Sequence, residues 1–428
     1  MAETHKTTGS AEKISTSFKV GFFLAYRDIK RANIWTTLLT IAVMVLTFLN
    51  LVVVSGILVG LIEGAVYAVR ERYLSDVFIS NLKNRSYIEQ TTNLVAFAER
   101  LPEVEHVSTR FVEGGQIQAN YKKLKKPKEL EELVSTSFIG IDPVKENNVT
   151  NLSKFVIEGD YLEEGDYDKV MLGAMLLKKY LDIESAGFTV LEDVTIGSKI
   201  KININGATRE VIVKGILKTK VDEIDRRVFF TDNQFRNLIN RFDYNADEIV
   251  LKLKKGGDAV YVRDVIKGAG FDQYAKVQTA EDGEPKFIKD MKKTFAILGN
   301  LISSIGLAVA SITVFIVIFI NAITRRKFIG ILKGIGISNL SIEFSYVVQS
   351  IFYALCGMAI GTVIVFGFLK PYLDAHPINF PFSDGILVAS ALGTSIRAVI
   401  LFVATVIAGY IPARIVVKQN TLDAILGR

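Results

Sequence analysis

Cysteine, histidine, proline and tryptophan are all scarce in this 428-residue chain. The single cysteine, Cys356, excludes an intrachain disulfide, and its place inside an apolar run predicts a small hydrophobic role. The three histidines, His5, His106 and His376, are far apart and lack the spacing of metal ligands. The acidic cluster of residues 163–168 is interpreted as a solvated turn rather than a cation site. The sequence therefore predicts no metal site.

Motifs for nucleotide binding and for covalent catalysis are also missing. The chain has no GxxxxGK[ST] phosphate-binding loop and no apparent Ser/His/Asp or Cys/His arrangement. We therefore expect this chain alone to have no enzyme activity and no cofactor. Its net charge of +6 is modest and forms no dense basic stripe, which argues against nucleic acid and favours lipid headgroups as partners.

Apolar residues make up 50% of the sequence and concentrate in long runs near both ends. A membrane-spanning helix needs about 20 predominantly apolar residues. Four segments meet this requirement: Ile34 to about Gly60, about Phe295 to Thr324, Phe344 to Leu369, and Ile386 to Ala413. The first run is too long for the apolar part of a signal peptide, so we expect an uncleaved anchor.

Basic residues flank the predicted spans on one side: Arg27, Lys30, Arg31, Arg325, Arg326, Lys327, Lys333, Arg414 and Lys418. The positive-inside rule assigns these flanks and both termini to the cytoplasm. Four lysines before the second span (286, 289, 292 and 293) run against this orientation. They follow a long translocated domain, and such domains are largely exempt from the rule.

Two charged residues lie close to the predicted spans. Glu63 lies roughly 42 Å along a helix from Trp35, which exceeds the hydrocarbon core and predicts a helical stalk beyond the membrane. Arg397 lies roughly 22 Å from Pro412, and two interpretations stay open. Its side chain reaches the outer headgroups, or it faces a central cavity and binds an anionic group.

The segment between the first two spans, residues 71–286, has the alternating pattern of a folded α+β domain. Each of its two ends has the order strand, helix, strand: 76–80, 89–101 and 106–120, then 248–253, 259–268 and 274–279. This predicts one βαβ subdomain split by a β-rich insertion of about residues 135–232. Within the insertion, Asn205 and Gly206 predict a β-hairpin. The predicted fold class is a four-helix membrane protein with a large α+β extracytoplasmic domain.

Residues 325–361 contain a basic pair, the segment FIGILKGIGIS and then the third span. This stretch resembles the MacB/FtsX/Lol superfamily of ABC transporter permeases, where the segment forms a coupling helix that docks on the ATPase. The matching residues are Arg325, Arg326, Ile329, Gly330, Ile331, Leu332, Lys333, Gly336 and Ser338. We expect Ile329, Leu332 and Lys333 to be exposed and to fit a groove of that partner.

Three further stretches are similar to the same family. The C-terminal sequence GYIPARIVVKQNTLDAILGR matches at Pro412, Ala413 and Arg414, although Asn420 and Thr421 stand where the family has a proline. Residues 18–35 resemble the family's amphipathic interfacial helix, with one apolar stripe formed by Phe18, Phe22, Ala25, Ile29 and Ala32. Residues 138–181 resemble the lipoprotein-releasing (LolC/LolE-like) permeases more than the macrolide-efflux ones.

Pro127 is the single proline in residues 121–132, so this segment does not form a proline-rich hook for a periplasmic chaperone. Four spans are too few for a pore, so we expect a second permease, identical or related. The GxxxG pairs Gly56/Gly60 and Gly357/Gly361 are candidates for the dimer seam.

Together these features predict the following order along the chain: cytoplasmic N-terminus with the interfacial helix (1–33), first span and stalk (34–70), extracytoplasmic domain (71–286), stalk and second span (287–324), coupling helix (325–343), third span (344–370), outer loop (371–385), fourth span (386–413) and cytoplasmic tail (414–428).

The resemblance implies a permease subunit in the cell membrane that works with two copies of a separate cytosolic ATPase, which bind the ATP and Mg²⁺. Its implied mechanism is mechanotransmission, in which ATP-driven movement is passed to the outer domain. The favoured cargo is a lipoprotein or other hydrophobic molecule taken from the outer side of the membrane. Alternatives are MacB-like efflux of a drug or peptide with an adaptor, and FtsX-like signalling to cell-wall hydrolases.

Overall fold

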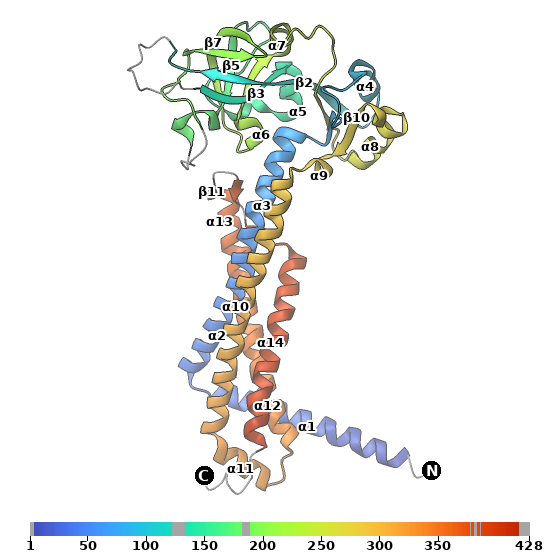
Figure 1. Cartoon of the computed structure of the whole chain (residues 1–428). Helices are drawn as coiled ribbons and strands as arrows, with labels where there is room; N and C mark the ends of the chain where they lie inside the picture. The colour runs from blue at the N-terminus through green and yellow to red at the C-terminus, as the bar shows by residue number, and fades with distance from the viewer. Residues whose placement is uncertain are drawn as a thin grey trace. The chain divides into compact units, whose positions relative to one another are not determined.

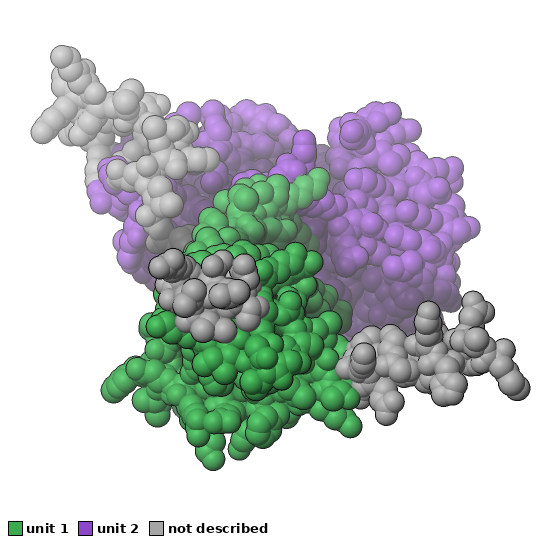
Figure 2. Space-filling view, turned by 90° about the horizontal axis from the view of Figure 1, so that it is seen from below, with its two compact units in different colours: residues 1–61, 291–378, 385–428 green, residues 62–290, 379–384 purple. Residues whose placement is uncertain are grey.

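The structure of the chain is a computed structural model that describes residues 4–121, 133–181, 189–376, 378–380, 383–385 and 387–418. The chain divides into two compact units (Figure 2). The helical unit comprises residues 1–61, 291–378 and 385–428, and the α+β unit comprises residues 62–290 and 379–384. Pro127 with the rest of residues 122–132, and Asn420 with Thr421, lie outside the described residues.

Among the residues that the structure describes, four helices are long and apolar enough to cross a membrane: Ile34–Leu74, Lys286–Thr324, Asn339–Ala375 and Ala391–Val417. The prediction of four apolar helices is therefore confirmed. The first has 41 residues and passes without a break through two π-helical turns, Asn50–Val54 and Arg70–Leu74. It is about 60 Å long, roughly twice the thickness of a hydrocarbon core.

The elements of the helical unit can be followed in Figure 1. They are α1 (Thr4–Arg31), α2 (Ile34–Leu49), α3 (Ser55–Val69, which continues into the α+β unit), α10 (Lys286–Thr324), α11 (Arg326–Gly334), α12 (Asn339–Ile364), a π-helical turn (Val365–Leu369), α13 (Lys370–Ala375) and α14 (Ala391–Val417). Side chains cap three of the starts: Asn33 caps α2, Ser338 caps α12 and Ser390 caps α14. Each cap accepts a hydrogen bond from a backbone N–H that has no partner inside its helix.

Small residues let the helices of this unit approach closely. A Cβ added at Gly357 would lie 2.3 Å from Cβ of Met44, and one at Gly361 would lie 2.4 Å from the ring of Phe48. Both glycines of α12 therefore serve packing against α2 of the same chain. Gly56 packs in the same way against residues 387–388, and Gly60 is buried. A role of these four glycines at a dimer seam stays a prediction.

Helix α1 also packs through a small residue. Ala25 is fully buried, and the ring of Phe18 meets that of Phe344 edge-on at 4.5 Å between centroids. Phe22, by contrast, is 61% exposed beside the exposed Phe23 and Tyr26. One part of the predicted apolar stripe therefore packs on α12 and another part is uncovered, and its role at a membrane interface stays a prediction.

The α+β unit is built on a ten-stranded sheet in the order β10-β1-β9-β2-β3-β8-β5-β7-β4, with β6 paired to β2 and β7. The strands are β1 (Val77–Asn81), β2 (Val104–Gln118), β3 (Leu133–Ile141), β4 (Val156–Gly159), β5 (Lys169–Gly173), β6 (Lys199–Ile204), β7 (Ala207–Leu217), β8 (Arg227–Thr231), β9 (Glu248–Leu253) and β10 (Ala275–Thr279). Its helices include α4 (Thr91–Ala98), α5 (Pro143–Thr150), α6 (Asp222–Asp225), α7 (Asp232–Leu238), α8 (Ala259–Gly268) and α9 (Ala280–Gly283). Two short strands, β11 (Ile378–Phe380) and β12 (Ser383–Gly385), pair separately.

The two ends of this unit interleave in the sheet. Strand β1 lies between β10 and β9, and β9 lies between β1 and β2, with every neighbouring pair antiparallel. This is the arrangement of a split βαβ pair, with α4 and α8 as the connecting helices. Strands β3 to β8 extend the same sheet, so the predicted insertion is not a separate compact unit.

The hairpin predicted at Asn205 and Gly206 is confirmed, because β6 and β7 pair antiparallel on either side of these two residues. Their φ angles are 51° and 82°, and a two-residue type I′ turn needs positive φ at both positions. The local sequence therefore fixes this turn and the register of both strands.

Candidate functional site

Helix α11 contains most of the residues predicted to couple the chain to an ATPase. Gly336 ends it with a φ of +93°, a conformation that favours glycine. The N–H groups of Gly336 and Ile337 donate to the carbonyls of Lys333 and Leu332, each at 3.0 Å. This paired bonding satisfies the last carbonyl groups of the helix and reverses the chain before α12.

The exposed face of α11 differs from the predicted one. Ile329 is only 3% exposed and Gly330 is buried, while Leu332 and Lys333 are half-buried. Phe328, Ile331 and Ile335 are instead 44%, 52% and 72% exposed. The prediction that Ile329 is exposed is wrong, because the helical period sets 329 and 332 against the bundle and 328, 331 and 335 opposite.

Lys333 of α11 and Ser338, which follows this helix, form hydrogen bonds to two other helices. The Nζ of Lys333 donates to the carbonyl of Val417 at 3.0 Å, near the C-terminal end of α14. The Oγ of Ser338 lies 3.1 Å from that of Ser17 on α1. Of the predicted tail residues, Pro412 is buried inside α14, and Arg414 donates to the hydroxyl of Tyr410 at 3.1 Å.

Arg325 precedes α11 and forms an ion pair that the sequence analysis did not predict. Its Nη1 lies 2.5 Å from Oδ1 of Asp28 on α1. Gln349 of α12 lies against the other oxygen of this carboxyl at 3.5 Å. Burial raises the pKa of the Asp28 carboxyl above its usual value, although Arg325 acts to lower it. The pair joins α1 to the start of α11, and Arg326 beside it is half-buried.

One signal in the sequence points to Asp28. It is the only acidic residue in the basic segment from Arg27 to Arg31, and it follows Ala25 by three positions. Residues three apart lie on one helical face, so a side chain packed like Ala25 brings Asp28 towards the bundle.

Arg397, the remaining predicted residue, lies on α14 and is half-buried. Its Nη2 donates to the Oγ of Ser55 at 2.7 Å. Arg325, Lys333 and Ser338 thus lie in α11 or directly beside it. Arg397 lies on a different helix, α14.

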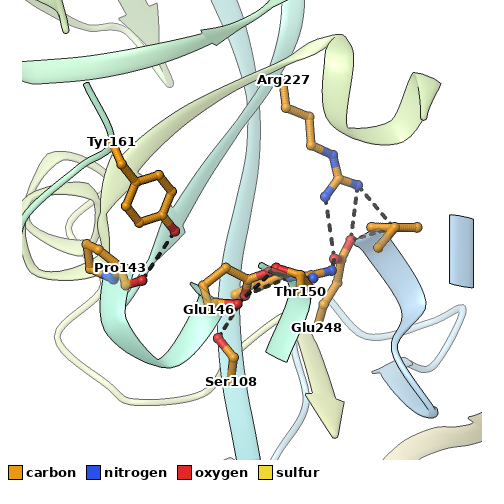
Figure 3. A network of polar contacts seen from close by, with 9 residues as sticks. Ser108, Pro143, Glu146, Thr150, Tyr161, Arg227 and Glu248 are labelled. Atoms are coloured by element: carbon orange, nitrogen blue, oxygen red, sulfur yellow. Dashed lines mark hydrogen bonds and ion pairs between the residues drawn. The ribbon is translucent and has the colours of Figure 1, made fainter. Parts of the chain in front are cut away.

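A second polar cluster lies inside the α+β unit (Figure 3). Nη2 of Arg110 lies 2.7 Å from Oε1 of Glu146, and the two side chains are 3% and 1% exposed. Arg110 also reaches Glu248 at 3.3 Å, and Arg227 reaches Glu248 at 3.1 Å. Burial acts to raise the pKa of the Glu248 carboxyl, but the two guanidinium groups hold it below its usual value.

Hydroxyl groups complete this cluster. Ser108 lies 2.8 Å from Oε2 of Glu146, and the hydroxyl of Tyr73 donates to Glu248 at 3.1 Å. Its two cations and two carboxylates therefore satisfy one another, an arrangement of a buried structural network rather than of a reactive site. Among the described residues no group of three or more His, Cys, Asp or Glu is placed to hold a metal ion.

The part of the chain that contains α11, α12 and α14 is similar to a known family. Residues 300–421 match the FtsX-like permease C-terminal family. The chain is 26% identical over 281 residues to the uncharacterised ABC transporter permease MJ1507 of Methanocaldococcus jannaschii, covering 63% of this chain and 65% of that protein. It is 27% identical over 145 residues to the macrolide export ATP-binding/permease protein MacB of Haemophilus ducreyi, covering 33% of this chain and 20% of MacB.

Two solved domains also resemble part of the chain. The periplasmic region of MacB from Actinobacillus actinomycetemcomitans gives a TM-score of 0.34 at 13% identity, over 50% of this chain and 92% of that domain. The extracellular domain of YknZ, a noncanonic ABC-type transporter from Gram-positive bacteria, gives 0.32 at 11% identity, over 48% and 100%.

Within the described residues the chain has four apolar helices, and residues 300–421 match the FtsX-like permease C-terminal family. The two curated relatives, of which the chain spans 65% and 20% of the length, are an ABC transporter permease and the ATP-binding/permease protein MacB. The chain is therefore similar to ABC transporter permeases. The finer resemblance to lipoprotein-releasing permeases stays a prediction.

Proposed function

We propose that this chain is the membrane subunit of an ABC transporter of the mechanotransmission type. A separate cytosolic ATPase, in two copies with ATP and Mg²⁺, drives movement that this chain passes to its extracytoplasmic domain. The observation that carries the proposal is an exposed apolar stripe, Phe328, Ile331 and Ile335, on a short helix inside the FtsX-like region. An exposed apolar helix face of this kind fits a hydrophobic groove in a partner protein.

The contacts of α11 support a role in passing on force. Lys333 bonds to the end of α14, and Arg325 is paired with Asp28 of α1. A push on the apolar stripe is therefore passed to two helices, α14 and α1, rather than absorbed by a loop. The basic flanks of the spans favour an orientation in the cell membrane with both termini and α11 in the cytoplasm.

The assembly that we propose contains a second permease, identical or related, because four helices do not enclose a pore. The favoured cargo is a lipoprotein or another hydrophobic molecule, taken from the outer side of the membrane. A second candidate is export of a small molecule or peptide, favoured by the similarity to MacB, whose name records macrolide export. Signalling to cell-wall hydrolases is a third, favoured by the FtsX-like family match.

Docking of the ATPase is tested by Ile331→Asp. Ile331 is 52% exposed, so a charge there leaves the bundle intact but opposes burial in a partner's groove. We expect the variant to lose about 2 kcal/mol or more of binding, as an apolar anchor at the centre of an interface does. The measurement is the amount of ATPase that co-purifies with the tagged protein in mild detergent.

A matched control is Val260→Asp on α8, a short helix of the α+β unit where Val260 is 49% exposed. It also replaces an aliphatic residue of similar exposure by aspartate, and it is expected to retain the ATPase. Ile331 is a sharper choice than Leu332, which is half-buried, so that a charge there would disturb folding as well. Normal ATPase binding by Ile331→Asp would refute the assigned role of α11.

The cargo is tested separately, by mass spectrometry of the proteins and lipids that accompany the wild-type complex. An ATPase together with an acylated protein supports lipoprotein extraction. An ATPase with a periplasmic adaptor favours efflux, and one with a hydrolase favours signalling. Absence of any ATPase contradicts the proposal as a whole.

A further inference from the structure

The side chain of Arg397 is a cation without an anionic partner in the described part of the chain. Its Nη2 donates to the hydroxyl of Ser55 at 2.7 Å, and no described carboxylate forms an ion pair with it. A hydroxyl does not neutralise a guanidinium, and a charge in an apolar helix is costly unless it is paired or reaches polar surroundings. The charge of Arg397 is therefore not neutralised within the described part of the chain, and an anion could neutralise it.

The guanidinium points towards the N-terminal end of its helix. Helical side chains tilt towards the N-terminus, and a Cβ added at Gly393 would lie 3.5 Å from Nη1 of Arg397. Arg397 is only about 9 Å along the helix from Ala391, whereas the whole of α14 is about 40 Å long. Its charged group thus lies at the depth where phospholipid phosphates begin, not at the centre of the bilayer.

Two further features make this end of α14 attractive to an anion. The N-terminus of a 27-residue helix carries roughly half a positive charge, which adds to that of the guanidinium. Thr394 lies one turn before Arg397 and is 6% exposed, yet its Oγ1 has no hydrogen-bond partner. A buried hydroxyl without a partner is uncommon, and because Thr394 lies on the same helical face as Arg397, a polar group that enters beside the guanidinium could satisfy it.

The surface beside this site suits acyl chains. Leu392, Ile396 and Val399 are 75%, 54% and 61% exposed on the same stretch of α14. An anion that arrives attached to hydrocarbon can therefore keep its chains against these residues while its charged group meets Arg397. Guanidinium binds phosphate through two parallel hydrogen bonds, a geometry that an ammonium does not provide.

We propose that Arg397, with Ser55 and the first turns of α14, binds the phosphate of an anionic phospholipid. A zwitterionic lipid brings its own cation, which competes with Arg397 for the phosphate, so the site prefers lipids with net negative charge. This site is separate from α11, and the proposal does not depend on the docking of an ATPase.

The test is native mass spectrometry of the full-length protein in detergent, titrated with phosphatidylglycerol, phosphatidylcholine or inorganic phosphate. We expect the wild type to retain phosphatidylglycerol about fivefold better than phosphatidylcholine, and Arg397→Gln to lose this preference. Arg397→Lys keeps the charge but not the planar fork of the guanidinium, and this variant is expected to retain part of the preference for phosphatidylglycerol. Inorganic phosphate, which lacks acyl chains, is expected not to displace the bound lipid.

Lys370→Gln is the matched control, because Lys370 lies at the end of another apolar helix but is already paired with Asp374 at 2.8 Å. It is expected to behave like the wild type. Equal retention of phosphatidylglycerol by the wild type and Arg397→Gln would overturn the site. Equal retention of the two lipids by the wild type would overturn its anionic preference, and displacement by inorganic phosphate would overturn the lipid as its source. Partial retention of the preference by Arg397→Lys, with an unfolding temperature of Arg397→Gln equal to that of the wild type, would tie the loss to the guanidinium rather than to misfolding.

Discussion

The two units of the chain place their charged and apolar side chains in opposite ways. In the α+β unit, Arg110 and Glu146 are almost completely buried and bond to each other. In the helical unit, Ile305, Ile312 and Ile316 of α10 are 64%, 58% and 48% exposed, while small residues such as Gly357 are buried. The two units therefore have side-chain distributions that suit two different solvents, lipid for the apolar helices and water for the mixed domain.

The two units also differ in the interactions that stabilise them. A water-facing domain gains stability by burying apolar side chains, and any charge in its interior must be matched. Helices in lipid gain little from burying apolar surface, so close packing of small residues and a few polar contacts decide how they associate. Substitutions in the two units should consequently differ in both mechanism and size.

The largest effect is expected for Arg110→Met in the α+β unit. The substitution leaves Glu146 as a buried carboxylate with only hydroxyl partners, and removing one member of a buried pair costs about 3–5 kcal/mol. Hydrogen exchange of peptides from β2 and β9 in the full-length protein measures this loss. Arg85→Met, which breaks an exposed pair with Glu89, is expected to cost about 0.5 kcal/mol or less. A similar loss in both variants would mean that the network of Figure 3 does not stabilise the unit.

An intermediate effect is expected for Gly357→Ala in the helical unit. The added Cβ would meet Cβ of Met44 at 2.3 Å, so α12 and α2 must move apart at a cost of about 1–3 kcal/mol. The single tryptophan, Trp35, lies on α2, and its fluorescence follows the thermal unfolding of this helix.

Gly367→Ala is the control for this packing, because the nearest atom to an added Cβ is at 3.9 Å, on the side chain of Val363. We expect its unfolding temperature to equal or exceed that of the wild type. If Gly357→Ala unfolds normally but changes the molecular mass of the particle in detergent, then the glycine acts at a seam between copies and not within one chain.

The smallest effect is expected for Asp28→Asn, at the end of the helical unit. Burial already favours the neutral carboxyl, so removing its charge is cheaper than at Arg110 and should cost about 1 kcal/mol. The measurement is hydrogen exchange of the peptide that contains α11, which should become faster. Asp374→Asn, which breaks an exposed pair with Lys370, should leave that exchange unchanged. Unchanged exchange in Asp28→Asn would mean that this ion pair does not hold α11.

Much of this fold can be predicted from local sequence patterns. The four apolar helices follow from run length and hydropathy, and the turn at Asn205 and Gly206 follows from the conformations that only these residues adopt readily. The existence of α11 also follows locally, since Gly336 fixes its end. Each of these features depends on residues that are neighbours in the chain.

The orientation of α11 is not local. Its sequence offers two apolar faces, one with Ile329 and Leu332 and the other with Phe328 and Ile331, and the pattern alone does not choose between them. The contacts with α1 and α14 decide that Ile329 is buried and Phe328 exposed. Asp28 was missed for the same reason, because its partner Arg325 is almost 300 positions away in the sequence.

The sequence by itself thus determined the class of this protein: four apolar helices, a mixed α/β domain and the FtsX-like segment. Only the tertiary structure decided which face of α11 is exposed, which glycines pack within the chain, and that Arg110, Glu146, Arg227 and Glu248 meet in one network. The physical reason is that hydropathy and turn conformation are properties of neighbouring residues. Burial of a particular face, and the matching of a buried charge, depend on side chains brought together from distant parts of the chain.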